Sequence, residues 1–305
     1  MSLEHRALLY GDMESFVEAT VPFLESGLER EQAVIAVARE PGLSALRDIL
    51  KPHGNAVLYF DSARFYEHPV RTLRDYQTIV RQSEPRTVCA LAEPVWDGWT
   101  ELQTREWVRY ESLINVVFAH SGARALCPYD TAQLAPRIIE DARRTHPVVV
   151  GDGHDGANDA YVDPARLGMG CDRARRFDRP GASEYMAIDG ADLHALRAFV
   201  AERATAHGLG RRPAQNLVTA VNEVAANALQ HGVPPMGLWI WRDGDDLVCE
   251  IGDNGFWRPS PLTGFIPPDS ALQRGFGLWT VRLLVDLMEL RAGWDGTFVR
   301  LHVRR

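Results

Sequence analysis

The first half of the chain is constrained most by its apolar runs, which are continuous rather than alternating. Residues 33–38 (AVIAVA) and 56–60 (AVLYF) are such runs. A strand that is apolar at every position is buried on both faces, which is typical of a parallel sheet with helices on both sides. The stretches between the strands have helical periodicity at 71–83, 104–119 and 132–143. Residues 1–150 are therefore predicted to form an α/β domain.

Open parallel sheets bind their ligands beyond the carboxyl ends of the strands. No GxxxxGK[ST] segment occurs, so a phosphate-binding P-loop is not expected. The residues expected near these strand ends or on the adjoining helix are Glu93, Trp96, Tyr110, Cys127 and Tyr129. Three of them are aromatic and Glu93 would repel a triphosphate. The prediction is a pocket for a small, partly apolar ligand, with no nucleotide bound there.

Cys127, His146 and Glu93 admit two interpretations. They could form a nucleophile set or a metal site. The interpretation that the sequence favours is a small buried thiol and a capping histidine beside Pro147.

In the second half, residues 212–232 are predicted to form one helix. Pro213 suits its first turn and Gly232 its end. An apolar stripe follows a helical repeat through Leu217, Val221, Val224 and Ala228. Glu223 and Asn227, four residues apart, border that stripe on one face, where they could meet a ligand. The alternative is an ordinary solvated surface pair.

Three further motifs follow this helix in order. An alternating strand ends in Asp253-Asn254-Gly255, Arg274-Gly275-Phe276-Gly277 opens an apolar helix, and a last strand begins at Gly296-Thr297. This series resembles the ATP-binding domain of the GHKL superfamily, and within it the serine-kinase anti-sigma factors, over residues 183–305. The resemblance implies a GHKL (Bergerat) α/β sandwich with a mixed or antiparallel sheet.

The resemblance also implies roles for individual residues. Asn227 would supply an oxygen to Mg²⁺ on the phosphates of ATP, since hard cations take oxygen ligands. Asp253 would accept a hydrogen bond from the adenine amino group. Glu223 would be the general base on the attacking hydroxyl.

Four more residues are expected to contact the nucleotide. Gly255 would let the backbone pass close to the base, and Thr297 would contact the base edge. Gly275 and Gly277 precede a helix N-terminus, where free N–H groups bind phosphate.

The lid between residues 255 and 277 departs from the family pattern. Trp257 stands where Asp-x-Gly-x-Gly would have its second glycine, and the segment lacks lysine. Arg258 and Arg274 are left as candidate phosphate contacts. The departure bears on lid closure and turnover more than on binding.

The first half resembles the MEDS family, the methanogen/methylotroph DcmR sensory domain, over about residues 3–150. The resemblance rests on His5 with Leu9-Tyr10, and on these segments: Phe23-Leu24-Glu25-Ser26-Gly27-Leu28, Glu93-Pro94, Tyr110-Glu111, Cys127-Pro128-Tyr129-Asp130 and Thr145-His146-Pro147. It implies a RecA-like fold that senses a small molecule. The sequence does not name that molecule.

These observations predict a two-domain chain, α/β followed by α+β. The predicted divisions are a sensory domain at 1–150, a linker at 151–182 and an ATPase domain at 183–305. The linker is assigned because Gly, Asp, Ala and Arg recur there with little periodicity.

Composition narrows the cellular setting. The net charge of −8 argues against a nucleic-acid surface, and no apolar run is long enough to span a membrane. The first residues show no signal-peptide pattern. The cysteines, Cys89, Cys127, Cys171 and Cys249, have no CxxC spacing, which favours reduced thiols in the cytoplasm.

The resemblances together imply an anti-sigma factor with ATP-dependent serine/threonine kinase activity, regulating transcription. Its partners would be a sigma factor and an anti-anti-sigma protein of the STAS type, with an N-terminal sensory domain setting its activity. The alternative is a partner-switch protein of the same fold that binds nucleotide without kinase activity. An ordinary histidine kinase is disfavoured because no phosphoacceptor helix pair precedes the ATPase motifs. The sequence leaves open whether the chain is a homodimer.

Overall fold

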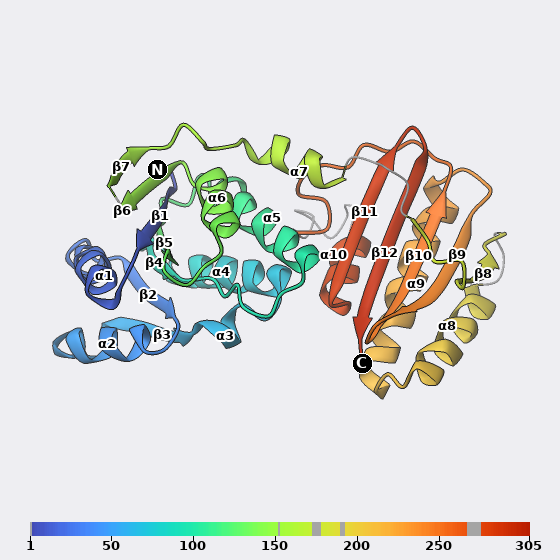
Figure 1. Cartoon of the computed structure of the whole chain (residues 1–305), viewed down its shortest axis with the longest axis horizontal. Coiled ribbons are helices and arrows are strands. Elements are labelled where there is room, and N and C mark those ends of the chain that lie inside the picture. The colour runs from blue at the N-terminus through green and yellow to red at the C-terminus, as the bar shows by residue number, and fades with distance from the viewer. Residues whose placement is uncertain (1, 152, 173–177, 190–192, 267–275) are drawn as a thin grey trace. The chain divides into compact units, whose positions relative to one another are not determined.

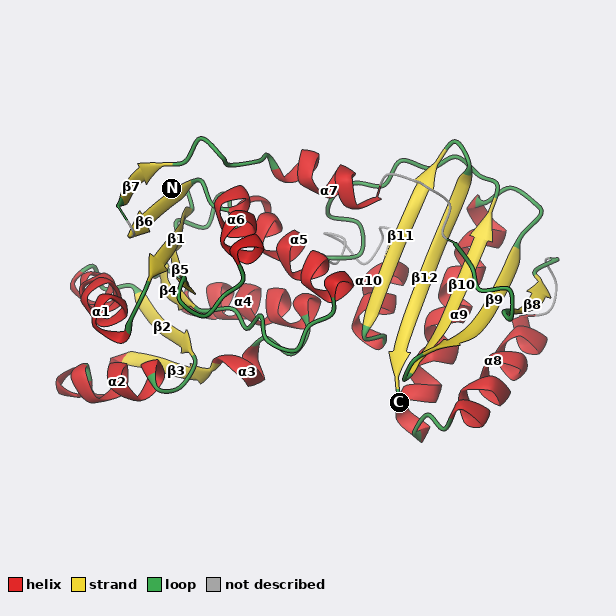
Figure 2. Ribbon diagram, in the orientation of Figure 1, coloured by secondary structure: helices red, strands yellow, loops and turns green. Residues whose placement is uncertain are grey.

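The chain separates into two compact units, Met1–Leu167 and Gly168–Arg305. The structure, a computed structural model, describes residues 2–151, 153–172, 178–189, 193–266 and 276–305. Each unit has a sheet of its own (Figures 1 and 2).

The first unit is built on a seven-stranded sheet in the order β3-β2-β4-β5-β1-β6-β7. Every neighbouring pair is parallel except β6 and β7. Nearly all residues of the central strands are buried, as the continuous apolar runs predicted. The strands are β1 (Glu4–Tyr10), β2 (Ala33–Ala38), β3 (Val57–Asp61), β4 (Val88–Ala92), β5 (Arg124–Asp130), β6 (Val148–Gly151) and β7 (His154–Ala157).

Helices cover both faces of this sheet. Figure 1 shows α1 and α2 on one side and α4, α5 and α6 on the other. Capping boxes begin the two longest of these helices, formed by Asp12 and Ser15 for α1 and by Thr100 and Gln103 for α5. The helices are α1 (Met13–Glu29), α2 (Gly42–Ile49), α3 (Ser62–Phe65), α4 (Pro69–Ser83), α5 (Glu101–Val117) and α6 (Pro136–Thr145), with a 3-10 turn at Lys51–Ala56.

The second unit is an antiparallel five-stranded sheet in the order β11-β12-β10-β9-β8. Its strands are β8 (Glu184–Ala187), β9 (Gly237–Asp243), β10 (Asp246–Asp253), β11 (Leu287–Gly293) and β12 (Gly296–Arg304). Three helices, α8 (Leu193–His207), α9 (Arg211–His231) and α10 (Phe276–Leu284), share one apolar core with the sheet. Alternate residues of β10, such as Cys249 and Ile251, point into that core.

The other face of this sheet carries ion pairs. Glu250 is fully buried and receives Arg300 Nη2 at 2.7 Å and the Nε of Arg179. The two guanidinium groups also lie over aromatic rings, Arg179 over Trp239 and Arg300 over Trp241. A buried carboxylate is thus neutralised by two cations from the chain itself.

The predicted linker at 151–182 contains more regular structure than its composition indicated. Strand β7 pairs antiparallel with β6, and α7 spans Pro164–Asp172. Antiparallel pairing needs only backbone groups and a short turn, so polar, Gly-rich residues can extend the sheet without an apolar pattern. The boundaries 1–150, 151–182 and 183–305 remain a proposal.

Candidate functional site

Helix α9 places Glu223 and Asn227 one turn apart on its half-buried side. The helix is held in position by Leu217, Val221 and Val224, which are buried in the core. Neither the Glu223 carboxylate nor the Asn227 amide forms a hydrogen bond with a described residue. Within the part of the chain that the structure describes, no internal hydrogen bond occupies either side chain, as a ligand contact would require.

Gly277, in the first turn of α10, lies directly against these two side chains. A Cβ built on Gly277 would be 3.2 Å from Asn227 Nδ2 and 3.3 Å from Glu223 Oε2. Glycine thus lets the beginning of α10 approach α9, and free backbone N–H groups at such a helix end can bind phosphate. Of the other residues predicted here, Arg274 and Gly275 lie outside the described residues.

Asp253, at the end of β10, offers one bonded and one open carboxylate oxygen. Its Oδ1 accepts the backbone N–H of Gly255 at 2.6 Å and that of Val233 at 3.2 Å. No described residue donates to Oδ2. The side chain is 6% exposed, and burial raises the pKa of Asp253, opposed by these two hydrogen bonds. The open oxygen suits a ligand donor such as an exocyclic amino group.

Two glycines make room for this carboxylate. A Cβ on Gly255 would lie 2.6 Å from Asp253 Oδ1, and one on Gly232 would lie 2.7 Å from Asp253 Cγ. A side chain at position 255 would therefore collide with the Asp253 carboxylate, so glycine is needed there independently of any contact with adenine. The sequence pattern indicates Gly232 only as a helix end, because its contact with Asp253 depends on how that end packs on β10.

Thr297 lies beside Asp253 on the neighbouring strand β12. Its hydroxyl donates to the Gly255 carbonyl at 3.0 Å. The proton is thereby occupied, and the Thr297 oxygen is left as an acceptor. The structure thus brings together Asp253, Gly255 and Thr297 at one end of α9, and Glu223, Asn227 and Gly277 further along it.

The five residues predicted to line one pocket in the first unit lie in different places in the structure. Glu93 is engaged by Arg39, through its backbone N–H at 2.9 Å and its Nε at 3.1 Å, and by the Tyr10 hydroxyl at 3.2 Å. Trp96 and Tyr129 pack against each other, with ring centroids 6.1 Å apart. Strand ends in this sheet are closed by ion pairs and aromatic packing, which the sequence pattern could not show.

A cavity instead lies under the sheet face covered by α4 and α5. Tyr110 and Cys127 line it, as do His5, Tyr66, Tyr76 and Glu111, and its volume is about 40 Å³. Cys127 and His146 do come together, as one interpretation of the sequence required. Their neighbours are His5 and Glu111, however, and not Glu93.

Two family models match the chain. Residues 4–147 match the MEDS model, the methanogen/methylotroph DcmR sensory domain, and residues 186–303 match the model of the histidine kinase-like ATPase domain. The chain joins a MEDS domain to a histidine kinase-like ATPase domain. Both predicted resemblances are thereby confirmed, as is the predicted fold of each half.

No curated protein matches the chain. One similar solved structure contains the RsbU and RsbW domains of Rv1364c from Mycobacterium tuberculosis. The sequences are 20% identical, the TM-score is 0.31, and the match covers 41% of this chain and 33% of that one. The match therefore spans about a third of the length of the Mycobacterium tuberculosis chain.

The lid of the ATPase domain is described only in part. Trp257 and Arg258 are exposed, and Phe256 stacks on Trp294 with ring centroids 4.5 Å apart. Phe256 follows Asp253 by three residues, close to the strand end where the open carboxylate oxygen lies. Among the described residues, no helix has both the length and the apolar character needed to cross a bilayer.

Proposed function

We propose that the ATPase domain binds ATP together with Mg²⁺ along α9. The observation that supports ATP binding is the order in which Asp253 and Asn227 lie along α9. Asp253 contacts Gly232 at the C-terminal end of the helix, and Asn227 lies five residues earlier, roughly 7–8 Å along its axis. The adenine amino group would donate to Asp253 Oδ2, with Thr297 as a neighbouring acceptor.

The phosphates would lie where α9 meets the beginning of α10. Asn227 Oδ1 would bind the Mg²⁺ that bridges them, and the backbone at Gly277 would donate to phosphate oxygens. Gly275 and Arg274, one turn earlier in the sequence, are proposed as further phosphate contacts. Arg258 is a third candidate cation, from the exposed part of the lid.

The proposed reaction transfers the γ-phosphoryl group of ATP to a serine hydroxyl of an anti-anti-sigma protein of the STAS type. The serine oxygen bonds to phosphorus, the bond from phosphorus to the β–γ bridging oxygen breaks, and ADP leaves. Glu223 accepts the hydroxyl proton, a role supported by its lack of any described hydrogen-bond partner and by its place beside Gly277.

In this proposal the chain is a cytoplasmic anti-sigma factor. It would hold a sigma factor, release it when the anti-anti-sigma protein is unphosphorylated, and respond to a small molecule through the MEDS domain. Coupling of this kind is reciprocal, so a ligand of the MEDS domain that changes partner or ATP affinity has its own affinity changed by the same factor. Nucleic acid is not a proposed partner.

A second candidate function is a partner switch that binds nucleotide but transfers no phosphate. Trp257 in place of a glycine favours it, because a bulky residue restricts the backbone of the lid. The absence of a lid lysine favours it too.

The test compares Glu223→Gln with Glu202→Gln, an exposed glutamate on α8, in the full chain. Calorimetry with and without Mg²⁺ measures ATP binding, and radiolabelled ATP with a STAS-type substrate measures transfer. The kinase proposal expects unchanged ATP affinity in both variants and transfer about 10²–10⁴-fold slower in Glu223→Gln only.

Three outcomes separate the candidates. ATP binding by the wild type without any transfer supports the partner switch. Acid-labile label on a histidine of this chain overturns the serine-kinase proposal. No ATP binding at all overturns both.

A further inference from the structure

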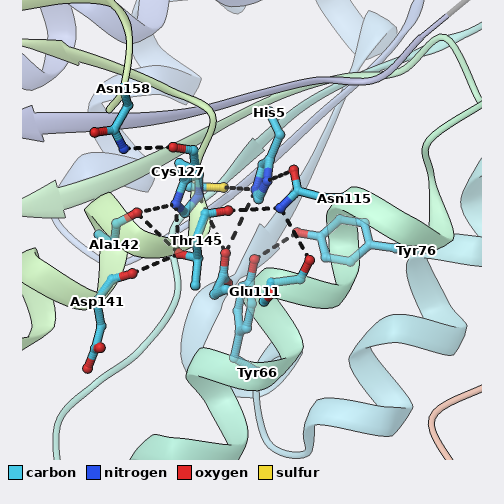
Figure 3. A network of polar contacts seen from close by, with 12 residues as sticks. His5, Tyr66, Tyr76, Glu111, Asn115, Cys127, Asp141, Ala142, Thr145 and Asn158 are labelled. Carbon is cyan, nitrogen blue, oxygen red and sulfur yellow. Dashed lines mark hydrogen bonds and ion pairs between the residues drawn. The ribbon is translucent and has the colours of Figure 1, made fainter. Parts of the chain in front are cut away.

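Four metal-ligating side chains meet inside the MEDS domain. His5 is on β1, Cys127 on the adjacent β5 and Glu111 on α5, while His146 directly follows α6. Each residue is at most 3% exposed. Their ligand atoms all lie within 4.8 Å of one another. Figure 3 shows His5, Cys127 and Glu111 directed toward one another.

Hydrogen bonds around the cluster fix the tautomers of both imidazoles. The Asn115 amide nitrogen donates to the Thr145 carbonyl at 2.8 Å, so its Oδ1 must be the acceptor that faces His5 Nδ1 at 3.0 Å. His146 Nδ1 lies 2.8 Å from the Ala142 carbonyl, which can only accept. Both Nδ1 atoms therefore carry the proton, and both Nε2 atoms present a lone pair to the centre of the cluster.

The centre of the cluster holds more acceptor atoms than donors, since the Cys127 thiol can donate only to His5 Nε2, at 3.5 Å. Neither Glu111 Oε2 nor His146 Nε2 has a hydrogen-bond partner among the described residues, although both atoms are buried. Buried polar groups left unpaired in this way are rare and costly.

Three of the distances between the ligand atoms are close to those of a tetrahedral coordination sphere. Cys127 Sγ lies 3.5 Å from His5 Nε2, and Glu111 Oε2 lies 3.9 Å from His5 Nε2 and 3.6 Å from His146 Nε2. A tetrahedral ion with bonds of about 2.0–2.3 Å holds its ligand atoms roughly 3.3–3.7 Å apart. The Nδ1 contacts to Asn115 and Ala142 are the outer contacts that orient metal-bound histidines.

We propose that His5, Glu111, Cys127 and His146 bind one divalent transition-metal ion of the zinc class. The thiol of Cys127 loses its proton on binding, Glu111 binds as the carboxylate, and the two negative charges neutralise the ion. Nitrogen and sulfur donors select such an ion over Mg²⁺ or Ca²⁺, which take oxygen ligands.

The cavity described above borders this site. Three of the four ligands, His5, Glu111 and Cys127, form part of its wall, and the rest is mainly aromatic and aliphatic. A small apolar molecule in the cavity would lie beside the metal. This proposal does not depend on ATP binding or on kinase activity.

The test loads the untagged, metal-free full chain with Co²⁺ as a spectroscopic probe for Zn²⁺. One equivalent of Co²⁺ should give the visible bands of a tetrahedral site and a near-ultraviolet sulfur-to-cobalt charge-transfer band. Cys127→Ser should lose the charge-transfer band. The matched control is Cys89→Ser, another buried thiol of the same sheet, which bonds to the Phe23 carbonyl and should keep the full spectrum.

A milder variant keeps the test valid if Cys127→Ser does not fold. Asn115→Ala leaves all four ligands in place and removes the orienting contact to His5, so Zn²⁺ affinity should fall about 10–100-fold. The proposal is overturned if wild type binds no stoichiometric Co²⁺, if its spectrum lacks the sulfur band, or if Cys89→Ser alone removes that band.

Discussion

Two buried glutamates, one in each domain, are treated in opposite ways by the fold. Glu250, on the back of the ATPase sheet, is fully buried and held by Arg179 and Arg300. Glu111, inside the MEDS domain, is 2% exposed and faces two imidazoles and a thiol. Glu250 has two arginines beside it, whereas the described residues place no arginine or lysine in an ion pair with Glu111.

The presence or absence of a counter-charge distinguishes a structural carboxylate from a ligand-binding one more clearly than burial alone. A carboxylate that stabilises the fold is given its counter-charge by the chain, because an unpaired buried charge is very costly. A buried carboxylate without such a counter-charge is stabilised when a cation from outside binds beside it. Asp253 is intermediate, since one oxygen is satisfied by backbone N–H groups and the other is open.

The largest expected effect on stability is that of Glu250→Gln. Removing one partner of a buried pair leaves uncompensated charge, and we expect a loss of about 3 kcal/mol in the free energy of unfolding. Both arginine side chains keep some contact with water, which limits the loss. Urea unfolding followed by circular dichroism measures it. Glu184→Gln, which breaks the exposed pair with Arg203, should cost at most about 1 kcal/mol.

The next largest effect is expected for Asp253→Ala, which tests the carboxylate with one bonded and one open oxygen. The variant removes the proposed acceptor of the adenine amino group, and ATP affinity should fall about 5–150-fold, corresponding to ~1–3 kcal/mol. Calorimetry of the full chain measures this. Asp246→Ala, at the opposite end of the same strand, is the control and should bind ATP like wild type. Equal affinity in all three proteins would refute the adenine assignment.

Thr297→Val should have a smaller effect. It removes the hydrogen bond to the Gly255 carbonyl at nearly constant volume, which should cost about 1 kcal/mol in stability and less than about tenfold in ATP affinity. Thermal unfolding and ATP titration measure the two. A larger loss of affinity than for Asp253→Ala would make Thr297 the principal base contact.

The smallest expected effect is that of Glu111→Gln in the metal-free chain. No described cation loses a partner, and a Gln amide can donate to an imidazole lone pair, so the stability change should stay below about 1 kcal/mol. The same urea experiment measures it. A loss as large as that of Glu250→Gln would mean that Glu111 is a structural ion-pair member, and the comparison between the two glutamates would fail.

Local patterns in the sequence were enough to predict the ATPase elements. Helix α9 was foreseen to within a residue at each end, because Pro213, Gly232 and the apolar repeat are all local signals. The family resemblance assigned Gly277, Glu223 and Asn227 to one nucleotide site, but it did not predict that Gly277 lies directly against the other two side chains. The contact between Gly232 and Asp253 was not predicted either, since it depends on how a helix end packs on a strand end.

The sequence pattern predicted only part of the MEDS cluster: one interpretation joined Cys127 and His146, but with Glu93 in place of His5 and Glu111. His5 and Cys127 are far apart in sequence and meet only because β1 and β5 are neighbours, an order that strand signals do not encode. Glu93 was chosen instead because it follows a buried strand. In the structure Glu93 forms an ion pair with Arg39. Nothing in the neighbouring sequence distinguishes a glutamate in such an ion pair from one that binds a ligand.

The segment that leaves the MEDS sheet is fastened to one of the proposed ligands. The Asn158 side chain, one residue beyond β7, donates to the His146 carbonyl at 2.8 Å and also to the Arg143 carbonyl, and its backbone N–H donates to Pro147. His146 therefore has its ring inside the cluster and its carbonyl under the outgoing chain. A displacement of His146 would therefore be transmitted directly to the segment around Asn158.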